Sequence, residues 1–136
     1  MTSEVKYLGE LRTEAVHLRS KQMIITDAPT DNQGKGEAFS PTDLASTSLA
    51  SCMATIMGIL AKRKNWNIDG TKFSVTKIMA DNPRRISEIQ IDIEVPHSNF
   101  SEEEKKMLEN AAITCPVAKS LHPEIKQALR FTYLGK

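Results

Sequence analysis

The chain has 136 residues, a net charge of +1 and 40% hydrophobic residues, which is typical of a single domain, residues 1–136, with a core. Lysines and arginines are spread along the chain and aromatic residues make up only 5%, so the composition does not support nucleic-acid binding. The first residues lack the apolar core of a signal peptide, and we therefore expect a cytoplasmic protein without a structural disulfide.

The N-terminal residues predict a β-hairpin followed by a loop. Residues 5–19 alternate in part between apolar and polar types, which predicts one long strand with a bulge near Gly9. Residues 22–26 predict a second, short strand, so this part is a hairpin. The loop that follows contains Gly34 and Gly36 but lacks the spacing and the terminal Lys-Ser/Thr of a phosphate-binding loop.

Residues 40–64 predict a long helix that is marked at both ends. Ser40 suits an N-cap, Pro41 suits the first turn, and Asp43 stands where a capping-box acid would stand. Three basic residues, 62–64, follow at the end where the helix dipole favours cations. Because residues 44–61 carry no charge, we expect this helix to be buried.

The same uncharged stretch raises the question of a membrane span. Five of its 18 residues are Ser or Thr and no second hydrophobic segment exists, so we expect no membrane association. A chain of 136 residues has too little surface to cover such a helix on all sides. We therefore expect an oligomer in which the sheet of a second subunit closes over the helix.

The second half predicts another hairpin, two helices and a closing strand. Residues 73–80 and 86–95 alternate as strands around a turn at 81–84, and Ser101 begins a helix with a capping box. Pro116 suits the start of a short helix, which puts Cys115 at or beside an N-cap. After a last strand at 125–134, the order of elements indicates an α+β fold with antiparallel sheets from β-hairpins around the central helix.

The two cysteines, Cys52 and Cys115, are the main candidates for chemistry. They lie 63 positions apart without a Cys-x-x-Cys motif, and the three histidines show no ligand spacing, so we expect no metal site. They are either buried thiols that fill space or reactive thiols. Cys115 has a helix N-terminus, which lowers a thiol pKa, whereas Cys52 lies about three turns inside its helix.

A reactive Cys52 would need a side-chain cation that an acidic group holds in place. The sequence offers three cations and two acids near the first hairpin and the helix start: Arg12, Arg19, Lys35, Glu37 and Asp43. We prefer Arg12, because an arginine inside a strand needs a partner, whereas Arg19 near a turn can face water.

The run from Ser40 to Cys52, with a proline eleven residues before the cysteine, and the later pair Cys115-Pro116 resemble the OsmC/Ohr family. These are the osmotically inducible and organic hydroperoxide resistance proteins. The order of helices and strands matches as well, so the resemblance covers most of the chain. It implies an OsmC-like fold and an intertwined homodimer with sites at the subunit interface.

The resemblance also implies a thiol-dependent peroxidase that reduces organic hydroperoxides and, more slowly, hydrogen peroxide. Cys52 would be the peroxidatic thiolate and Cys115 the resolving thiol, with Arg12 and Asp43 as the activating pair. The resemblance implies no bound cofactor, because an external dithiol would reset the cysteines.

The sequence departs from the family pattern at one position. Organic-peroxide members carry Glu directly after the helix-starting proline, where this chain has Thr42, and Asp43 lies about 100° further around the helix. Asp43 is therefore as well explained as a capping acid. Two alternatives stay open: an OsmC-like protein with little peroxidase activity that binds a small hydrophobic ligand at the dimer interface, and a structural protein with two packing cysteines.

Overall fold

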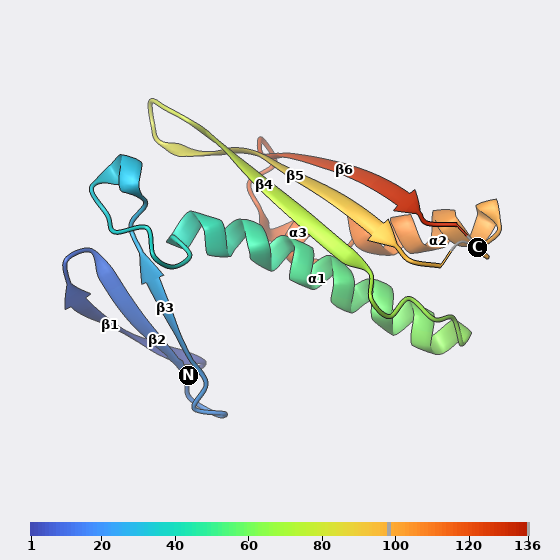
Figure 1. Cartoon of the computed structure of the whole chain (residues 1–136), viewed down its shortest axis with the longest axis horizontal. Helices are drawn as coiled ribbons and strands as arrows, with labels where there is room; N and C mark the ends of the chain where they lie inside the picture. Colours follow the sequence, from blue (N-terminus) through green and yellow to red (C-terminus); the bar gives the residue numbers. More distant parts are fainter. Residues whose placement is uncertain (98, 136) are drawn as a thin grey trace. The chain divides into compact units, whose positions relative to one another are not determined.

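The computed structural model describes residues 1–97 and 99–135 (Figure 1). The chain forms two compact units, Met1–Ala45 and Ser46–Lys136, and each has its own sheet. The boundary between the units falls inside the long helix α1 (Pro41–Lys64).

The first unit is a three-stranded antiparallel sheet in the order β1-β2-β3. Its strands are β1 (Ser3–Gly9), β2 (Arg12–His17) and β3 (Met23–Asp27). The predicted single strand over residues 5–19 is wrong, because the chain reverses at Gly9, Glu10 and Leu11, which have φ angles of 93°, 54° and 64°. Glu and Leu rarely adopt positive φ, so nothing in their identity signals a turn.

The loop between β3 and α1, residues 28–39, folds back on its own start. It contains the short 3₁₀ helix η1 (Thr30–Asn32). The Gly34 amide donates to the Pro29 carbonyl oxygen at 2.9 Å, and the Gly36 amide donates to the Ala28 carbonyl oxygen at 3.2 Å. A Cβ atom at Gly34 would collide with the Ala28 backbone carbonyl. The close approach of these two segments therefore requires glycine at position 34.

Helix α1 begins and ends where the sequence predicts. The Ser40 side chain accepts from the Asp43 amide at 3.0 Å, and the Asp43 carboxylate accepts from the Ser40 amide at 3.0 Å, which is a reciprocal capping arrangement. Lys62, Arg63 and Lys64 occupy the last turn, at the negative end of the helix dipole.

Helix α1 is buried on one face only. Leu49, Met53 and Met57 are fully buried, whereas Ile59 is 53% exposed. In the part of the chain that the structure describes, α1 is the one helix long and apolar enough to cross a membrane. Its buried face belongs to the core of the second unit, as expected for the central helix of a folded domain.

The second sheet, in the order β4-β5-β6, is the other component of this core. Its strands are β4 (Lys72–Ala80), β5 (Arg85–Val95) and β6 (Lys126–Tyr133). One face of β5 contributes four fully buried side chains, Ile89, Ile91, Ile93 and Val95, which confirms the predicted alternation. Strands β4 and β5 pair in antiparallel fashion, whereas β5 and β6 pair in parallel.

The parallel pair was not predicted, and its connection explains it. Parallel strands need a long crossover, which here contains α2 (Glu102–Ile113) and α3 (Pro116–Ser120). Helix α2 begins with the predicted capping box between Ser101 and Glu104. Its buried residues Leu108 and Ala112 join the core cluster that contains the buried face of α1.

Candidate functional site

The structure brings the two cysteines together within the second unit. Cys52 lies on α1 and is partly buried, whereas Cys115 is fully buried at the N-cap of α3. Both are free thiols, and each is close enough to the other for a side-chain interaction. Helices α2 and α3 lead the chain back to the core helix α1, so the two cysteines interact although 63 positions separate them in the sequence.

The electrostatic environment of Cys115 differs from the sequence-based expectation. Its sulfur accepts from the Ala118 amide at 3.4 Å, as expected at a helix N-terminus. Burial nevertheless raises the pKa of the Cys115 thiol, and hydrogen bonding and repulsion from the neighbouring Cys52 raise it further. These effects outweigh the backbone amides of Ala118 and Val117, which lower the pKa. Cys115 is therefore protonated at neutral pH, and the predicted lowering of its pKa is wrong.

A cluster of one cation and two acids occupies the first unit, and we call Arg12, Asp27 and Glu37 the Arg12 cluster. The Arg12 guanidinium donates to both oxygens of Asp27, at 2.7 and 2.8 Å, and to Glu37 at 2.9 Å. The Glu37 amide donates to the Asp27 carboxylate at 3.1 Å, which joins the 28–39 loop to the cluster. The Asp27 side chain is 1% exposed and that of Arg12 30%.

The pairing keeps both members of the Arg12–Asp27 pair charged. Hydrogen bonds from Arg12 hold the pKa of Asp27 below its usual value of 3.8, although burial opposes this effect. Hydrogen bonds to Asp27 and Glu37 raise the pKa of Arg12 above its usual value. The guanidinium is therefore a fixed positive charge whose position is set by two carboxylates.

The other sequence-predicted residues have local roles in the structure. Asp43 caps α1 through Ser40, Arg19 lies exposed in the turn after β2, and Lys35 forms an ion pair with Glu10 at 3.0 Å. Arg12 has the acidic partners that an arginine inside a strand was expected to need.

Sequence reasoning missed Asp27, the acid that holds Arg12 most closely. Asp27 ends an apolar strand, where an aspartate is typical of a turn, so its residue type did not mark it. Arg12 and Asp27 are direct partners in the β2–β3 register. Only the pairing register of the two strands could have identified this contact.

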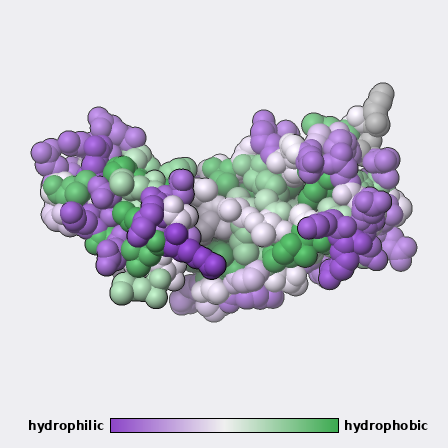
Figure 2. All heavy atoms as spheres, turned by 90° about the horizontal axis from the view of Figure 1, so that it is seen from below, coloured by the Kyte–Doolittle hydropathy of each residue, from purple (hydrophilic) through white to green (hydrophobic). Residues whose placement is uncertain are grey.

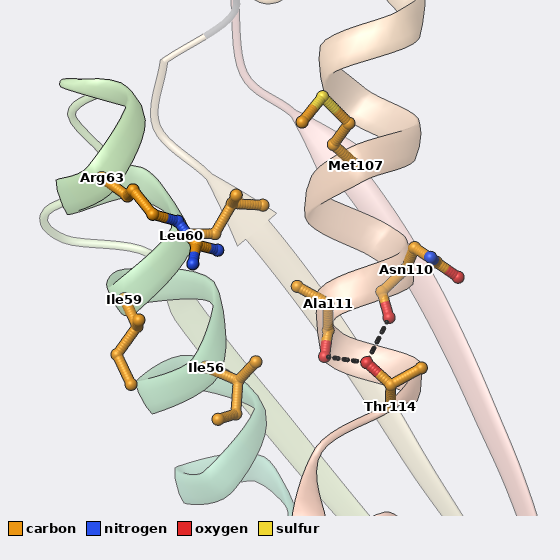
Figure 3. A pocket seen from close by; sticks show the side chains of 8 residues that line it. All are labelled: Ile56, Ile59, Leu60, Arg63, Met107, Asn110, Ala111 and Thr114. Carbon is orange, nitrogen blue, oxygen red and sulfur yellow. Dashed lines mark hydrogen bonds between the residues drawn. The ribbon is translucent and has the colours of Figure 1, made fainter.

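A groove of about 330 Å³ lies between α1 and α2 in the second unit (Figure 3). Ile56, Ile59 and Leu60 form its apolar wall on α1, and Met107 and Ala111 face them from α2. Its polar lining residues are Arg63, Asn110 and Thr114, the last of which donates its hydroxyl to the Asn110 and Ala111 carbonyl oxygens. We call this the α1–α2 groove.

Metal chemistry receives no support from the arrangement of ligands. Within residues 1–97 and 99–135, no group of three or more His, Cys, Asp or Glu side chains is placed to hold a metal ion.

Comparisons with known proteins agree with the fold described above. Residues 34–130 match the family model described as OsmC-like protein. A crystal structure from Psychrobacter arcticus 273-4, of a protein named for an inferred role in osmotic stress induction and detoxification response, is 55% identical to this chain. The comparison covers 97% of this chain and 96% of that one, with a TM-score of 0.93. No curated protein sequence matches.

More distant structures share the fold. An organic hydroperoxide resistance protein OsmC from Legionella pneumophila is 14% identical over 97% of each chain, with a TM-score of 0.76. The organic hydroperoxide resistance protein OhrB of Bacillus subtilis is 18% identical over 97% of this chain and 98% of that one, with a TM-score of 0.69. At these identities the likeness concerns the arrangement of helices and strands.

Proposed function

This chain belongs to the OsmC-like protein family, and we propose that it is a thiol-dependent peroxidase that reduces organic hydroperoxides and, more slowly, hydrogen peroxide. Membership of the family supports a stress-response or peroxide-related role. The observation that carries the finer proposal is the interaction between Cys52 and Cys115, whose different burial suits different tasks. The partly buried Cys52 can meet a peroxide, whereas the buried, protonated Cys115 can serve as the resolving thiol.

The proposed reaction has three balanced steps. The Cys52 thiolate attacks the distal oxygen of a hydroperoxide, the O–O bond breaks, and Cys52 becomes a sulfenic acid while the released alkoxide takes a proton from water and leaves as the alcohol. The Cys115 thiol then displaces hydroxide from the sulfenic sulfur, which forms the Cys52–Cys115 disulfide and releases water. An external dithiol supplies two electrons and two protons, restores both thiols and leaves as its own disulfide.

We assign activation of the Cys52 thiolate to Arg12. A cation stabilises a thiolate, and the Arg12 guanidinium is a fixed charge held by Asp27 and Glu37. In family members that reduce organic peroxides, a glutamate follows the helix-starting proline, at the position where this chain has Thr42. We propose that Asp27 and Glu37 replace that glutamate as the acidic partners of the arginine. Asp43 contributes by fixing the start of the helix that carries Cys52.

We propose that the protein acts as a homodimer. The first unit has three buried residues in its described part, Thr26, Asp27 and Ser40, and all are polar. A three-stranded sheet needs an apolar face against a neighbour, and several large apolar side chains of this unit are exposed: Val5, Tyr7, Leu8, Leu11, Met23, Ile24 and Phe39. Figure 2 shows such green, hydrophobic side chains at the surface.

Sedimentation equilibrium tests the dimer. Since one chain has a mass of 15.1 kDa, we expect a single species of about twice that mass at micromolar concentration. A species with the mass of one chain over the whole concentration range would contradict the proposal.

A dithiol-dependent cycle requires a reducing compartment, so we also propose a cytoplasmic location.

A mass-resolved thiol count tests the peroxidase proposal. Reduced protein receives one equivalent of cumene hydroperoxide or, in parallel, of hydrogen peroxide. We expect loss of both thiols with a mass decrease of two hydrogens, and faster loss with cumene hydroperoxide, because Cys52 and Cys115 form a disulfide. Survival of both thiols over minutes would contradict the proposal and favour the alternative, an OsmC-like protein that binds a small hydrophobic ligand.

A further inference from the structure

We propose that a pocket at the C-terminal end of α1 binds a small neutral sugar or polyol, a function separate from the proposed peroxidase chemistry. The pocket has a volume of about 370 Å³, and we call it the Trp66 pocket. Seven residues line it: Asn65, Trp66, Asn67, His97, Asn99, Phe100 and Glu104. None of them belongs to the Arg12 cluster or to the lining of the α1–α2 groove.

The Trp66 pocket lies within the second unit, where three segments of the chain end or begin. Trp66 closely follows α1, Asn99 lies between β5 and α2, and Glu104 is in the first turn of α2. Cys52 is twelve residues before Lys64, the last residue of α1, which corresponds to a rise of about 18 Å along the helix. The pocket is therefore separate from the thiols.

Two aromatic rings provide the apolar wall of the pocket. Trp66 and Phe100 meet edge to face, with ring centroids 5.6 Å apart and an angle of 72° between the ring planes. Phe100 is buried and also contacts the ring of Tyr133 at 6.3 Å, so the core holds it in place. Trp66 is only partly buried and presents its indole to the pocket. The electron-rich face of an aromatic ring suits the C–H groups on one face of a sugar ring.

The polar side chains of the pocket have hydrogen-bonding groups that the fold does not use. In the part of the chain that the structure describes, the side chains of Asn65, His97 and Asn99 make no hydrogen bond. One oxygen of the Glu104 carboxylate accepts from the Ser101 amide at 2.9 Å, and the other oxygen has no protein donor among the described residues. The pocket therefore offers both donors and acceptors to a ligand.

This mixture of donors and acceptors selects the class of ligand. An ammonium group only donates, so it would leave the N–H groups of the amides without partners. A phosphate group only accepts, and the Glu104 carboxylate would repel it. A hydroxyl group both donates and accepts, so neighbouring hydroxyl groups on one ring satisfy amides, an imidazole and a carboxylate together. The volume is near the lower end of the range of about 300–1,000 Å³ for small-molecule sites, which limits the ligand to about one sugar ring.

The fluorescence of Trp66 tests the pocket directly, because Trp66 is the one tryptophan of the chain and lines the pocket. The reduced full-length protein is titrated with D-glucose, D-galactose, D-mannose and myo-inositol, each up to about 50 mM. We expect at least one of them to change the emission in a saturable way, with a dissociation constant of about 1 mM. No peroxide is present, so the result does not depend on the peroxidase function. The absence of a saturable change with all four probes would overturn the proposal.

Two variants show whether the bound probe uses the polar side chains. Asn99→Leu and His97→Phe keep about the size of each side chain but remove its donor and acceptor, so each should weaken binding by about five- to tenfold. Asn32→Leu makes the same change in the 28–39 loop of the first unit and should leave binding unchanged. Equal affinities of all three variants and the wild type would overturn the proposal, because the probe would then bind without these groups.

Two charged probes test the class of ligand. Choline chloride and inorganic phosphate are titrated in the same way, and we expect no saturable change with either up to about 50 mM. Saturable binding of choline in place of the sugars would assign the pocket to organic cations, and saturable binding of phosphate would assign it to anions. Either result would overturn the proposal.

Discussion

Replacing Cys52 by serine is expected to slow the consumption of organic hydroperoxide by at least about a thousandfold. A serine hydroxyl remains protonated at neutral pH and is a far weaker nucleophile than a thiolate, and no second nucleophile of the proposed cycle can replace it. The measurement is peroxide loss with cumene hydroperoxide and excess dithiol, at matched concentrations of variant and wild type. Near-normal turnover by Cys52→Ser would end the peroxidase proposal.

The Cys115→Ser variant is the matched control, because it removes the second thiol but keeps the nucleophile. We expect it to consume about one equivalent of peroxide quickly and to accumulate a sulfenic acid at Cys52, which a dimedone adduct of Cys52 would report. Its later turnover should be slower than that of the wild type, since the resolving thiol is missing. Equal behaviour of the two variants would contradict their separate roles.

Replacing Ile91 by alanine is expected to lower the free energy of unfolding by about 2–5 kcal/mol and the melting temperature by about 10 °C. Ile91 lies on the central strand β5 with no exposed surface, within the cluster that contains the buried face of α1. Removing its methyl groups loses their burial and leaves a cavity that the surrounding sheet and helix cannot fill. Urea denaturation at a fixed protein concentration measures the effect.

The control is Ile78→Ala on the neighbouring strand β4, where the same side chain is 37% exposed. Its expected cost is below about 1 kcal/mol, because less apolar surface is returned to water and no closed cavity forms. Both variants are compared at one concentration, since the stability of a dimer depends on concentration. Equal losses for the two isoleucines would contradict the position of the core on the inner face of β5.

The parts of the fold that depend on neighbouring residues could be read from the sequence. Ser40, Asp43 and the basic end at Lys64 predicted both ends of α1, because helix caps and the helix dipole act within one turn. The capping box at Ser101 and the N-cap position of Cys115 were predicted for the same reason. The alternating strand β5 followed from the period of two residues in an extended chain.

The parts that depend on distant pairing could not be read in this way. The parallel pair β5–β6 joins Asp92 and Arg130, which are 38 positions apart and form an ion pair on the exposed face of the sheet. No local pattern specifies such a partner. The turn at Glu10 and Leu11 was missed because these residues adopt a backbone conformation that their side chains disfavour.

The same distinction between local signals and distant pairing applies to the candidate site. The positions of both cysteines on their helices followed from local signals, whereas the interaction between their side chains in the resting protein depends on the packing of the core, which no local pattern specifies. The partner of Arg12 depends on the β2–β3 register, which the sequence does not reveal, so Asp27 was missed. The raised pKa of Cys115 arises from burial in the folded core, which the helix N-terminus alone could not indicate.

Gly34 has a consequence for the mutational tolerance of this protein. Every other amino acid would place a Cβ atom on the Ala28 carbonyl, whereas Gly58 in the middle of α1 has open space around its Cα. Natural variation can therefore enlarge position 58 at little steric cost, but a substitution at position 34 must displace the backbone that leads to Glu37. A single-nucleotide change in the codon of Gly34 would thus disturb the hydrogen bond between Glu37 and Arg12 without altering either of these charged residues.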